Sequence, residues 1–180
     1  MSSPKFELRF PVVDVEEWAA RYVGQNFQIE EVERSLQAIA RLAKQRGYMT
    51  RGEFLKIAMW KSPRPKKWYE DNSYGRIKSA TKAAFSTRNS RVKIERLIQL
   101  SGVNYPVASA ILHLACNNVP ILDVNALAAF GLERRANYDF QFWSAYCDAV
   151  KEIVRESGLS YRIVDRALWT YGKCHPAAKA

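Results

Sequence analysis

The sequence is poor in cysteine, glycine and proline. It has 3 cysteines, 8 glycines and 7 prolines in 180 residues. The cysteines are odd in number and share no C-x-x-C spacing, which argues against a disulfide framework and against a four-cysteine metal or iron–sulfur site. The small share of glycine and proline argues against collagen-like repeats and low-complexity sequence. A chain of this length can be stable through an ordinary hydrophobic core.

Long hydrophobic runs are also missing. No apolar stretch approaches the roughly 20 residues that cross a bilayer, and the first ten residues lack the apolar segment of a signal peptide. We therefore expect an intracellular protein, cytoplasmic or nucleoid-associated, with free thiols and no membrane partner. The sequence points to no protein partner.

Acidic residues are scarce in the middle of the chain. Residues 41–96 hold 16 basic and 4 acidic side chains, a net charge of +12, whereas residues 1–40 and 97–180 sum to −3 and +1. Cationic groups beside aromatic rings suit a polyanion that carries aromatic bases, and a solvated helical face is the alternative. The aromatic residues interleaved with these charges are Trp60, Trp68, Tyr69, Tyr74 and Phe85.

Helical periodicity dominates the sequence, which predicts an all-α, compact multi-helix domain that can be two-lobed. The segment after residue 28 is expected to bury a stripe that includes Val32 and Leu36, and residues 6–13 are expected to be extended. The predicted helices cover residues 14–24, 29–47, 50–62, 72 or 73 to 85, 90–100, 105–116, 123–130, 139–158 and 160–171.

Capping residues support several of these boundaries. Thr50 and Glu53 form a capping box, in which each side chain can satisfy a backbone amide of the other residue. Asp123, Asp139 and Ser160 stand where N-caps are expected, since each directly precedes a helical segment.

The most specific stretch is LIQLSGVNYPVA, residues 97–108, in which a short turn joins two helices. Gly102 permits a positive φ, Asn104 tolerates the left-handed region, and Pro106 suits the first turn of a helix. The turn is therefore expected to direct backbone amides outward at a helix N-terminus. Such amides can hold a phosphate without distinguishing between base sequences.

The letters LIQLSGVN resemble the helix-hairpin-helix of the DNA glycosylase superfamily, whose hairpin usually has the sequence L-x-x-L-P-G-V-G. The later letters VPILDVNAL are similar to the P-[IV]-[LV]-D-x-N segment of the adenine-mismatch branch. Asp123 falls on the family's catalytic aspartate, and it follows Gly102 by about the family's usual spacing. The clear match covers residues 91–131, with the hairpin at about 91–117, and implies a single glycosylase-like domain over residues 1–180.

The resemblance implies a monofunctional DNA N-glycosylase that hydrolyses the N-glycosidic bond of a flipped damaged or mismatched base. Asp123 would stabilise the positive charge that develops on the sugar and activate water, although an acidic residue at a helix start is more often only an N-cap. Pro106 stands where the bifunctional branches have a nucleophilic lysine, which argues against a lyase. The family's iron–sulfur motif is absent and no cofactor is required. The carbonyls of Leu100 and Val103 could hold a monovalent cation, as in related proteins, and the metal is left open.

Further site residues follow from the resemblance. Trp60 is expected to stack on the extruded base, with core packing as the alternative. Lys61 and Arg64 are expected to meet phosphate or the base edge, with a solvated helix end as the alternative. The residues expected to bind the DNA backbone are Lys66, Lys67, Arg88, Arg91, Ser101, Gly102, Val103, Asn104 and Tyr105.

Other polar residues favour structural roles. Asp165 and Arg166 are interpreted as a surface ion pair, His113 as a core or half-buried histidine, and His175 as part of a frayed tail.

Two other functions of the protein remain open. One is a noncatalytic helix-hairpin-helix DNA-binding protein in which Asp123 is only a cap. The other is a scaffold or regulator whose basic surface binds RNA or protein.

Overall fold

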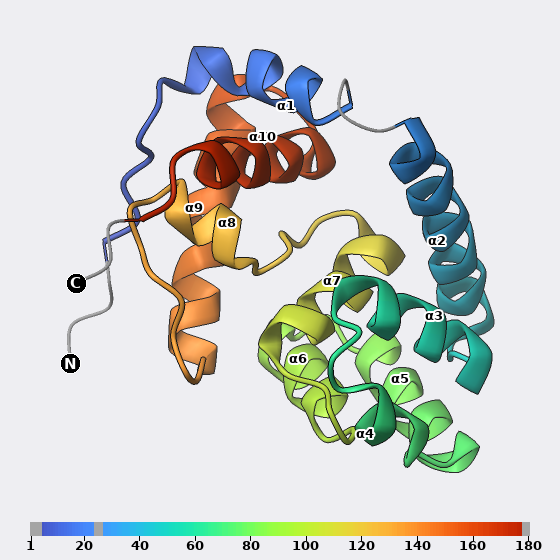
Figure 1. Ribbon diagram of the computed structural model, residues 1–180. Coiled ribbons are helices and arrows are strands. Elements are labelled where there is room, and N and C mark those ends of the chain that lie inside the picture. Colours follow the sequence, from blue (N-terminus) through green and yellow to red (C-terminus); the bar gives the residue numbers. More distant parts are fainter. Residues whose placement is uncertain (1–4, 24–26, 178–180) are drawn as a thin grey trace. The chain divides into compact units, whose positions relative to one another are not determined.

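The structure is a computed structural model that describes residues 5–23 and 27–177 (Figure 1). Within these ranges the chain forms helices and no strand, which confirms the predicted all-α class. A 3-10 turn, η1 (Val12–Asp14), leads into the first helix. The helices are α1 (Val15–Val23), α2 (Phe27–Arg46), α3 (Arg51–Lys61), α4 (Lys66–Glu70), α5 (Tyr74–Ser86), α6 (Ser90–Ile98), α7 (Tyr105–Cys116), α8 (Val124–Ala128), α9 (Phe140–Ser157) and α10 (Tyr161–Cys174).

The chain separates into two compact units. Unit 1 consists of Met1–Glu30 and Asn118–Ala180, and unit 2 is the continuous stretch Glu31–Asn117. Unit 2 has 17 basic and 6 acidic side chains, a net charge of +11, whereas unit 1 has 11 basic and 12 acidic side chains, a net charge of −1. The positive charge of the protein therefore belongs to unit 2. A single glycosylase-like domain over residues 1–180 stays a prediction.

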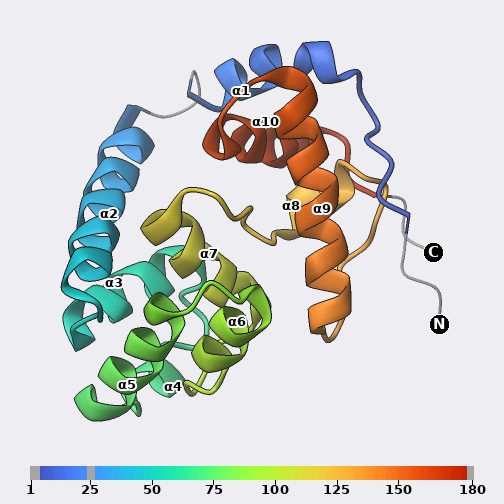
Figure 2. The same cartoon turned by 180° about the vertical axis from the view of Figure 1, so that it is seen from behind.

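Unit 2 is built around α7. Every residue of α7 from Val107 to Ala115 is buried, as expected for a helix with neighbours on all sides. The helices α3 and α6 both pack against it (Figure 2). They contribute the fully buried side chains of Phe54 and Ile57 from α3 and of Leu97 from α6. This core fixes the two helix ends between which the predicted hairpin turn lies.

Unit 1 is built around α10, which packs against α1 and α8. Val164 and Leu168 of α10 and Leu127 of α8 are fully buried. The crossing of α8 and α10 is very close at Gly172, where a Cβ atom would lie 1.8 Å from the carbonyl oxygen of Asn125. The missing side chain of Gly172 is therefore what permits α8 to lie directly on α10.

The capping signals of α3, α9 and α10 are confirmed, whereas α6 is capped by Asn89 and not by Ser90. Thr50 and Glu53 form the predicted capping box at the start of α3. The side chains of Asp139 and Ser160 accept hydrogen bonds from the first turns of α9 and α10. Gly47, after the end of α2, has a φ of +89°, as a glycine that ends a helix often does.

Two predictions about the helices were wrong. Leu36 of α2 is buried as predicted, but Val32 was also expected to be buried and is 49% exposed. Glu33 takes the place of Val32 in the buried line, which continues through Leu36, Ala40 and Ala43. Residues 66–70 were not predicted to be helical, yet they form α4.

The first segment also differs from the prediction. Asp14 ends η1 and α1 begins one residue later, so Asp14 does not begin the helix as expected. The predicted end of that helix at Gly24 lies outside the described residues. The segment before η1 has no regular structure at residues 5–11.

The three cysteines form no disulfide with one another. Cys116, Cys147 and Cys174 are all free, and burial raises the pKa of the Cys147 thiol well above its ordinary value. Within residues 5–23 and 27–177, no helix has both the length and the apolar character that crossing a membrane requires.

Candidate functional site

The turn between α6 and α7 is centred on Gly102, whose φ is +79°. A Cβ atom at Gly102 would lie 2.9 Å from both Trp68 Cβ and Tyr69 Cδ1, so a close approach to α4 adds a second requirement for glycine. Asn104 tolerates the left-handed region but does not adopt it here, since its φ is −117°. It serves instead as the N-cap of α7, where its side chain accepts a hydrogen bond from Val107 N at 3.2 Å.

Asn72 fastens this turn to α4. Its side chain is buried, and Nδ2 lies 3.0 Å from the carbonyl oxygens of both Trp68 and Ser101 and 3.1 Å from that of Tyr69. Its Oδ1 accepts a hydrogen bond from Ser101 N at 2.9 Å. The sequence left Asn72 and Ser73 as alternative caps of α5. The cap is Ser73, which leaves Asn72 to hold α4 and the turn together.

The backbone amides of the turn are only partly available. Those of Ser101 and Val103 donate within the protein, the second to Leu100 O at 3.0 Å. The amides of Gly102 and Asn104 are the turn donors for which no acceptor lies among the described residues. A phosphate at this turn would therefore meet these two amides first.

The side chains of Val103 and Tyr105 are buried. A role for either residue in DNA binding therefore rests on its backbone. The Leu100 carbonyl already accepts one hydrogen bond from Val103 N, and a carbonyl has a second lone pair. A monovalent cation at this carbonyl and that of Val103 stays a prediction.

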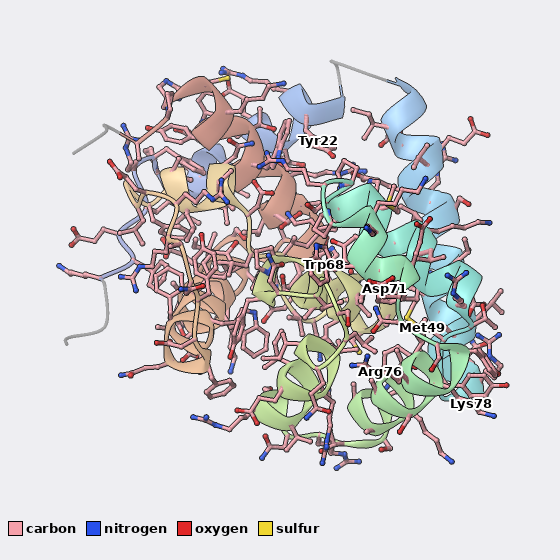
Figure 3. The ribbon with its side chains drawn as sticks, turned by 60° about the horizontal axis from the view of Figure 1, so that its bottom comes forward. Tyr22, Met49, Trp68, Asp71, Arg76 and Lys78 are labelled. Carbon is pink, nitrogen blue, oxygen red and sulfur yellow. The ribbon has the colours of Figure 1, made fainter. Side chains whose placement is uncertain are left out.

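An open depression borders the turn. It has a volume of about 390 Å³ and is lined by Arg64, Pro65, Trp68 and Gly102. Trp68, labelled in Figure 3, is 64% exposed. Trp60, the residue predicted to stack on a base, is half-buried in α3. Both tryptophans lie in the same basic stretch, and nothing in the sequence indicates which of them is exposed. Trp68 was therefore not among the predicted base-pocket residues.

A second depression borders the start of the turn, at Gln99 and Leu100. Arg76 Nη2 donates a hydrogen bond to the carbonyl of Gln99 at 3.0 Å, which places this guanidinium at the end of α6. The volume of this second depression is about 220 Å³. The lining residues are Arg76, Ser79, Ala80, Ala83, Arg96, Gln99 and Leu100.

The cations near the turn are not all the predicted ones. Arg88 and Arg91 lie at the opposite end of α6 from the turn, and Arg91 forms an ion pair with Glu95 at 3.3 Å. Arg76 and Arg96, which were not selected from the sequence, line the depression beside the turn. All four arginines lie in the basic stretch of residues 41–96, so the sequence does not indicate which of them are near the turn. The fold does.

The predicted lysines lie on α3 and α4. Lys66 and Lys67 are exposed in the first turn of α4, and the Lys66 ammonium is 3.9 Å from the Glu70 carboxylate. Such an exposed pair contributes little to stability and leaves the ammonium accessible to another anion. Lys61 is half-buried in the last turn of α3.

The role of Gly102 can be separated from that of an ordinary helix-ending glycine. We expect Gly102→Ala to lower the free energy of unfolding more than Gly47→Ala, measured by urea denaturation. Both substitutions place alanine at a positive φ, which costs about 1–2 kcal/mol. Only the Cβ at Gly102 also meets other atoms, whereas a Cβ at Gly47 meets nothing within 4 Å. Equal losses would show that contact with α4 is unimportant.

Asp123 belongs to unit 1 and is the predicted N-cap of α8. Its Oδ1 accepts a hydrogen bond from Asn125 N at 2.9 Å, and its carbonyl accepts one from Leu127 N at 2.9 Å. The side chain is partly exposed. Capping by Asp123 is therefore confirmed, and solvent can still reach this residue.

The residues around Asp123 form a rigid frame. The Tyr146 hydroxyl donates to the carbonyl of Ile121 at 2.9 Å and so holds the segment that leads into Asp123. Burial raises the pKa of Tyr146 well above its ordinary value, and Asp165, Cys147 and Asp123 act in the same direction. Tyr146 therefore remains a neutral hydrogen-bond donor at physiological pH.

The predicted pair of Asp165 and Arg166 was wrong. Asp165 is buried and forms its ion pair with Arg162, one helical turn away, at 2.5 Å. Arg166 instead pairs with Glu30 at 3.3 Å. Consecutive residues of a helix point in different directions, whereas residues three apart are neighbours. Both ion pairs lie within unit 1.

The two histidines have structural positions. His113 is buried in α7, as predicted. His175 was expected in a frayed tail, but it is the C-cap of α10 and its ring stacks on Tyr171 with a centroid distance of 4.3 Å. In the part of the chain that the structure describes, no three His, Cys, Asp or Glu side chains are grouped so that they could hold a metal ion.

Comparisons with protein-family models, with curated proteins and with solved structures find no match for this chain.

Proposed function

We propose that the chain is a monofunctional DNA N-glycosylase in which Asp123 carries the chemistry. The observation that carries this proposal is the position of Asp123, a partly exposed carboxylate fixed by a helix cap in the segment VPILDVNAL. A carboxylate on a rigid frame is preorganised, and a preorganised negative charge stabilises a cationic transition state more than a mobile one does. The resemblance of the segment to the adenine-mismatch branch supports the same assignment.

The proposed reaction is a hydrolysis. The bond between the sugar C1′ and the base nitrogen breaks, and its electron pair leaves with the base, which takes up a proton. The Asp123 carboxylate stabilises the positive charge that develops on the sugar and orients a water molecule. The water oxygen forms the new bond to C1′ and loses a proton, so the products are a free base and an abasic site.

Unit 2 supplies the DNA affinity in this proposal. Its net charge of +11 suits the phosphate backbone, and neutralising phosphates releases counterions. Gly102 and Asn104 would bind a phosphate through their amides. Trp60, Lys61 and Arg64 remain the proposed base-pocket residues. Arg64 has the strongest support of these three because it is exposed beside the turn.

The decisive experiment tests for release of a base. Purified protein is incubated with duplexes that carry alkylated, oxidised, deaminated or mismatched bases, and the free base and the abasic site are measured. We expect an abasic strand that remains intact and no borohydride-trapped adduct, since Pro106 occupies the position of the family's nucleophilic lysine. A trapped adduct would overturn the monofunctional assignment, and Lys61 would be tested as the nucleophile.

The arginines beside the turn are expected to dominate the salt dependence of DNA binding. Replacing Arg64 and Arg96 with glutamine should lower the slope of log K against log salt by about two units, if each contacts one phosphate. Replacing Arg88 and Arg91 removes the same charge at the other end of α6 and serves as the matched control. We expect a smaller change there. Equal changes would indicate attraction by the whole unit and not binding at the turn.

A noncatalytic DNA-binding protein is the second candidate. It is favoured by one observation: Asp123 already has a complete structural task, because its side chain caps α8. In this case the protein would bind the duplex backbone through unit 2, and no base would be released from any duplex of the panel.

A further inference from the structure

Trp68 stands out among the five tryptophans of the chain. Its exposed fraction is 64%, whereas Trp143 is 2% exposed and Trp18, Trp60 and Trp169 are half-buried. A single exposed apolar side chain is common at protein surfaces and indicates nothing by itself. Trp68, however, lies in a depression together with a cation and with the backbone of the hairpin turn.

The position of Trp68 is fixed by its backbone. Its Cβ lies against Gly102, close enough that even a methyl group at Gly102 would collide with it. Its carbonyl accepts a hydrogen bond from the buried side chain of Asn72 at 3.0 Å. The indole ring is thus exposed on a rigid support, which lowers the entropy lost when a ligand binds.

The surroundings of the ring select an anionic ligand with a flat face. Arg64 is exposed and lines the same depression, and the unit that carries both residues has a net charge of +11. An indole offers a stacking surface to any nucleobase, while a guanidinium beside it binds phosphate. A neutral lipid or a neutral apolar peptide would gain nothing from the excess of positive charge.

We propose that Trp68 is a stacking platform for an unpaired nucleobase, with Arg64 binding the adjacent phosphate. The proposal rests on DNA as the partner of unit 2, and it adds that the bound DNA includes a base outside the helical stack. A base within a duplex has both faces covered by its neighbours, so only an unpaired or extruded base presents a free face to the indole.

Two single strands of equal charge test this proposal. One is a fluorescein-labelled 12-nucleotide oligothymidylate, and the other has the same backbone with abasic residues. We expect the parent protein to bind the first strand more tightly. Trp68→Ala should lower the affinity for oligothymidylate by about 5- to 150-fold, the range that stacking of one base gives, and leave the affinity for the abasic strand unchanged. Trp68→Phe should recover part of the loss.

The salt dependence provides an independent readout. Stacking displaces no counterions, so Trp68→Ala should leave the salt slope unchanged, whereas Arg64→Gln should lower it by about 0.7, the value for one phosphate of a single strand. Tyr74→Ala is the matched control because Tyr74 is a second exposed aromatic residue of unit 2, 46% exposed, and does not line the depression. The Tyr74→Ala variant should bind both strands as tightly as the parent protein does.

Each alternative outcome is informative. If Trp68→Ala loses affinity equally for both strands, or if Tyr74→Ala has the same effect, Trp68 is not a specific stacking site. If Trp68→Ala binds oligothymidylate as the parent does, the proposal is wrong although unit 2 still binds DNA. If the parent binds neither the single strands nor a duplex, the proposed function fails together with this inference.

Discussion

Asp123→Asn is expected to abolish most base release while leaving DNA affinity close to that of the parent. Asparagine caps helices about as well as aspartate, so the hydrogen bond to Asn125 N should survive. The negative charge that stabilises the sugar cation is lost. Removing one preorganised electrostatic group typically lowers turnover by about 100- to 1000-fold. Single-turnover release of base from the best duplex of the panel measures this effect.

Two further substitutions separate charge from capping. Asp139→Asn makes the same chemical change at another N-cap of unit 1, where the side chain accepts from Phe142 N at 2.8 Å, and should leave base release unchanged. Asp123→Ala should remove both charge and cap and cost about 0.5–2 kcal/mol of stability. Release at the parental rate by Asp123→Asn would show that the carboxylate is a cap alone.

Gly172→Ala is expected to destabilise the protein strongly. The added Cβ would lie 1.8 Å from Asn125 O and 2.7 Å from Asn125 C, which are backbone atoms that cannot rotate away. The helices α8 and α10 would have to separate and lose their shared core. We expect a loss of at least about 3 kcal/mol in the free energy of unfolding, at the upper end of the usual cost of overpacking.

Gly75→Ala is the matched control for this prediction. Gly75 also lies in a helix, α5, but a Cβ atom there meets nothing within 4 Å. Alanine should therefore be neutral or add up to about 1 kcal/mol of stability, because it is the better helix former. Urea denaturation compares the two variants. A loss below about 1 kcal/mol for Gly172→Ala would contradict the close contact of α8 with α10.

Features that depend on neighbouring residues could be predicted from the sequence. The capping box at Thr50 and the caps at Asp123 and Asp139 involve partners two or three residues away, so their spacing alone identifies them. The all-α class follows from the same local periodicity. The short helix α4 was missed because five residues are too few for periodicity, and Pro63 and Pro65 suggested a break.

Features that depend on distant residues could not be predicted. Asn72 binds Ser101 across 29 positions, and Gly172 approaches Asn125 across a helix crossing. Nothing in their local sequence indicates these partners. The choice between Trp60 and Trp68 has the same origin, because exposure depends on how α3 and α4 pack. The catalytic role of Asp123 stays a prediction, since capping by itself does not distinguish a catalyst from a cap.

The two units differ in how they can form during synthesis. Residues 31–117 contain all of unit 2, so its core can form as soon as this stretch has left the ribosome. Unit 1 joins segments from both ends of the sequence: Arg9 Nη1 donates to the carbonyl of His175, 166 positions away, and α1 packs on α10. A nascent chain must therefore keep the apolar face of α1 uncovered until α10 follows, and contacts of such long range form slowly. A chain that stops before α10 would retain the positive charge of unit 2 but lack the frame that positions Asp123.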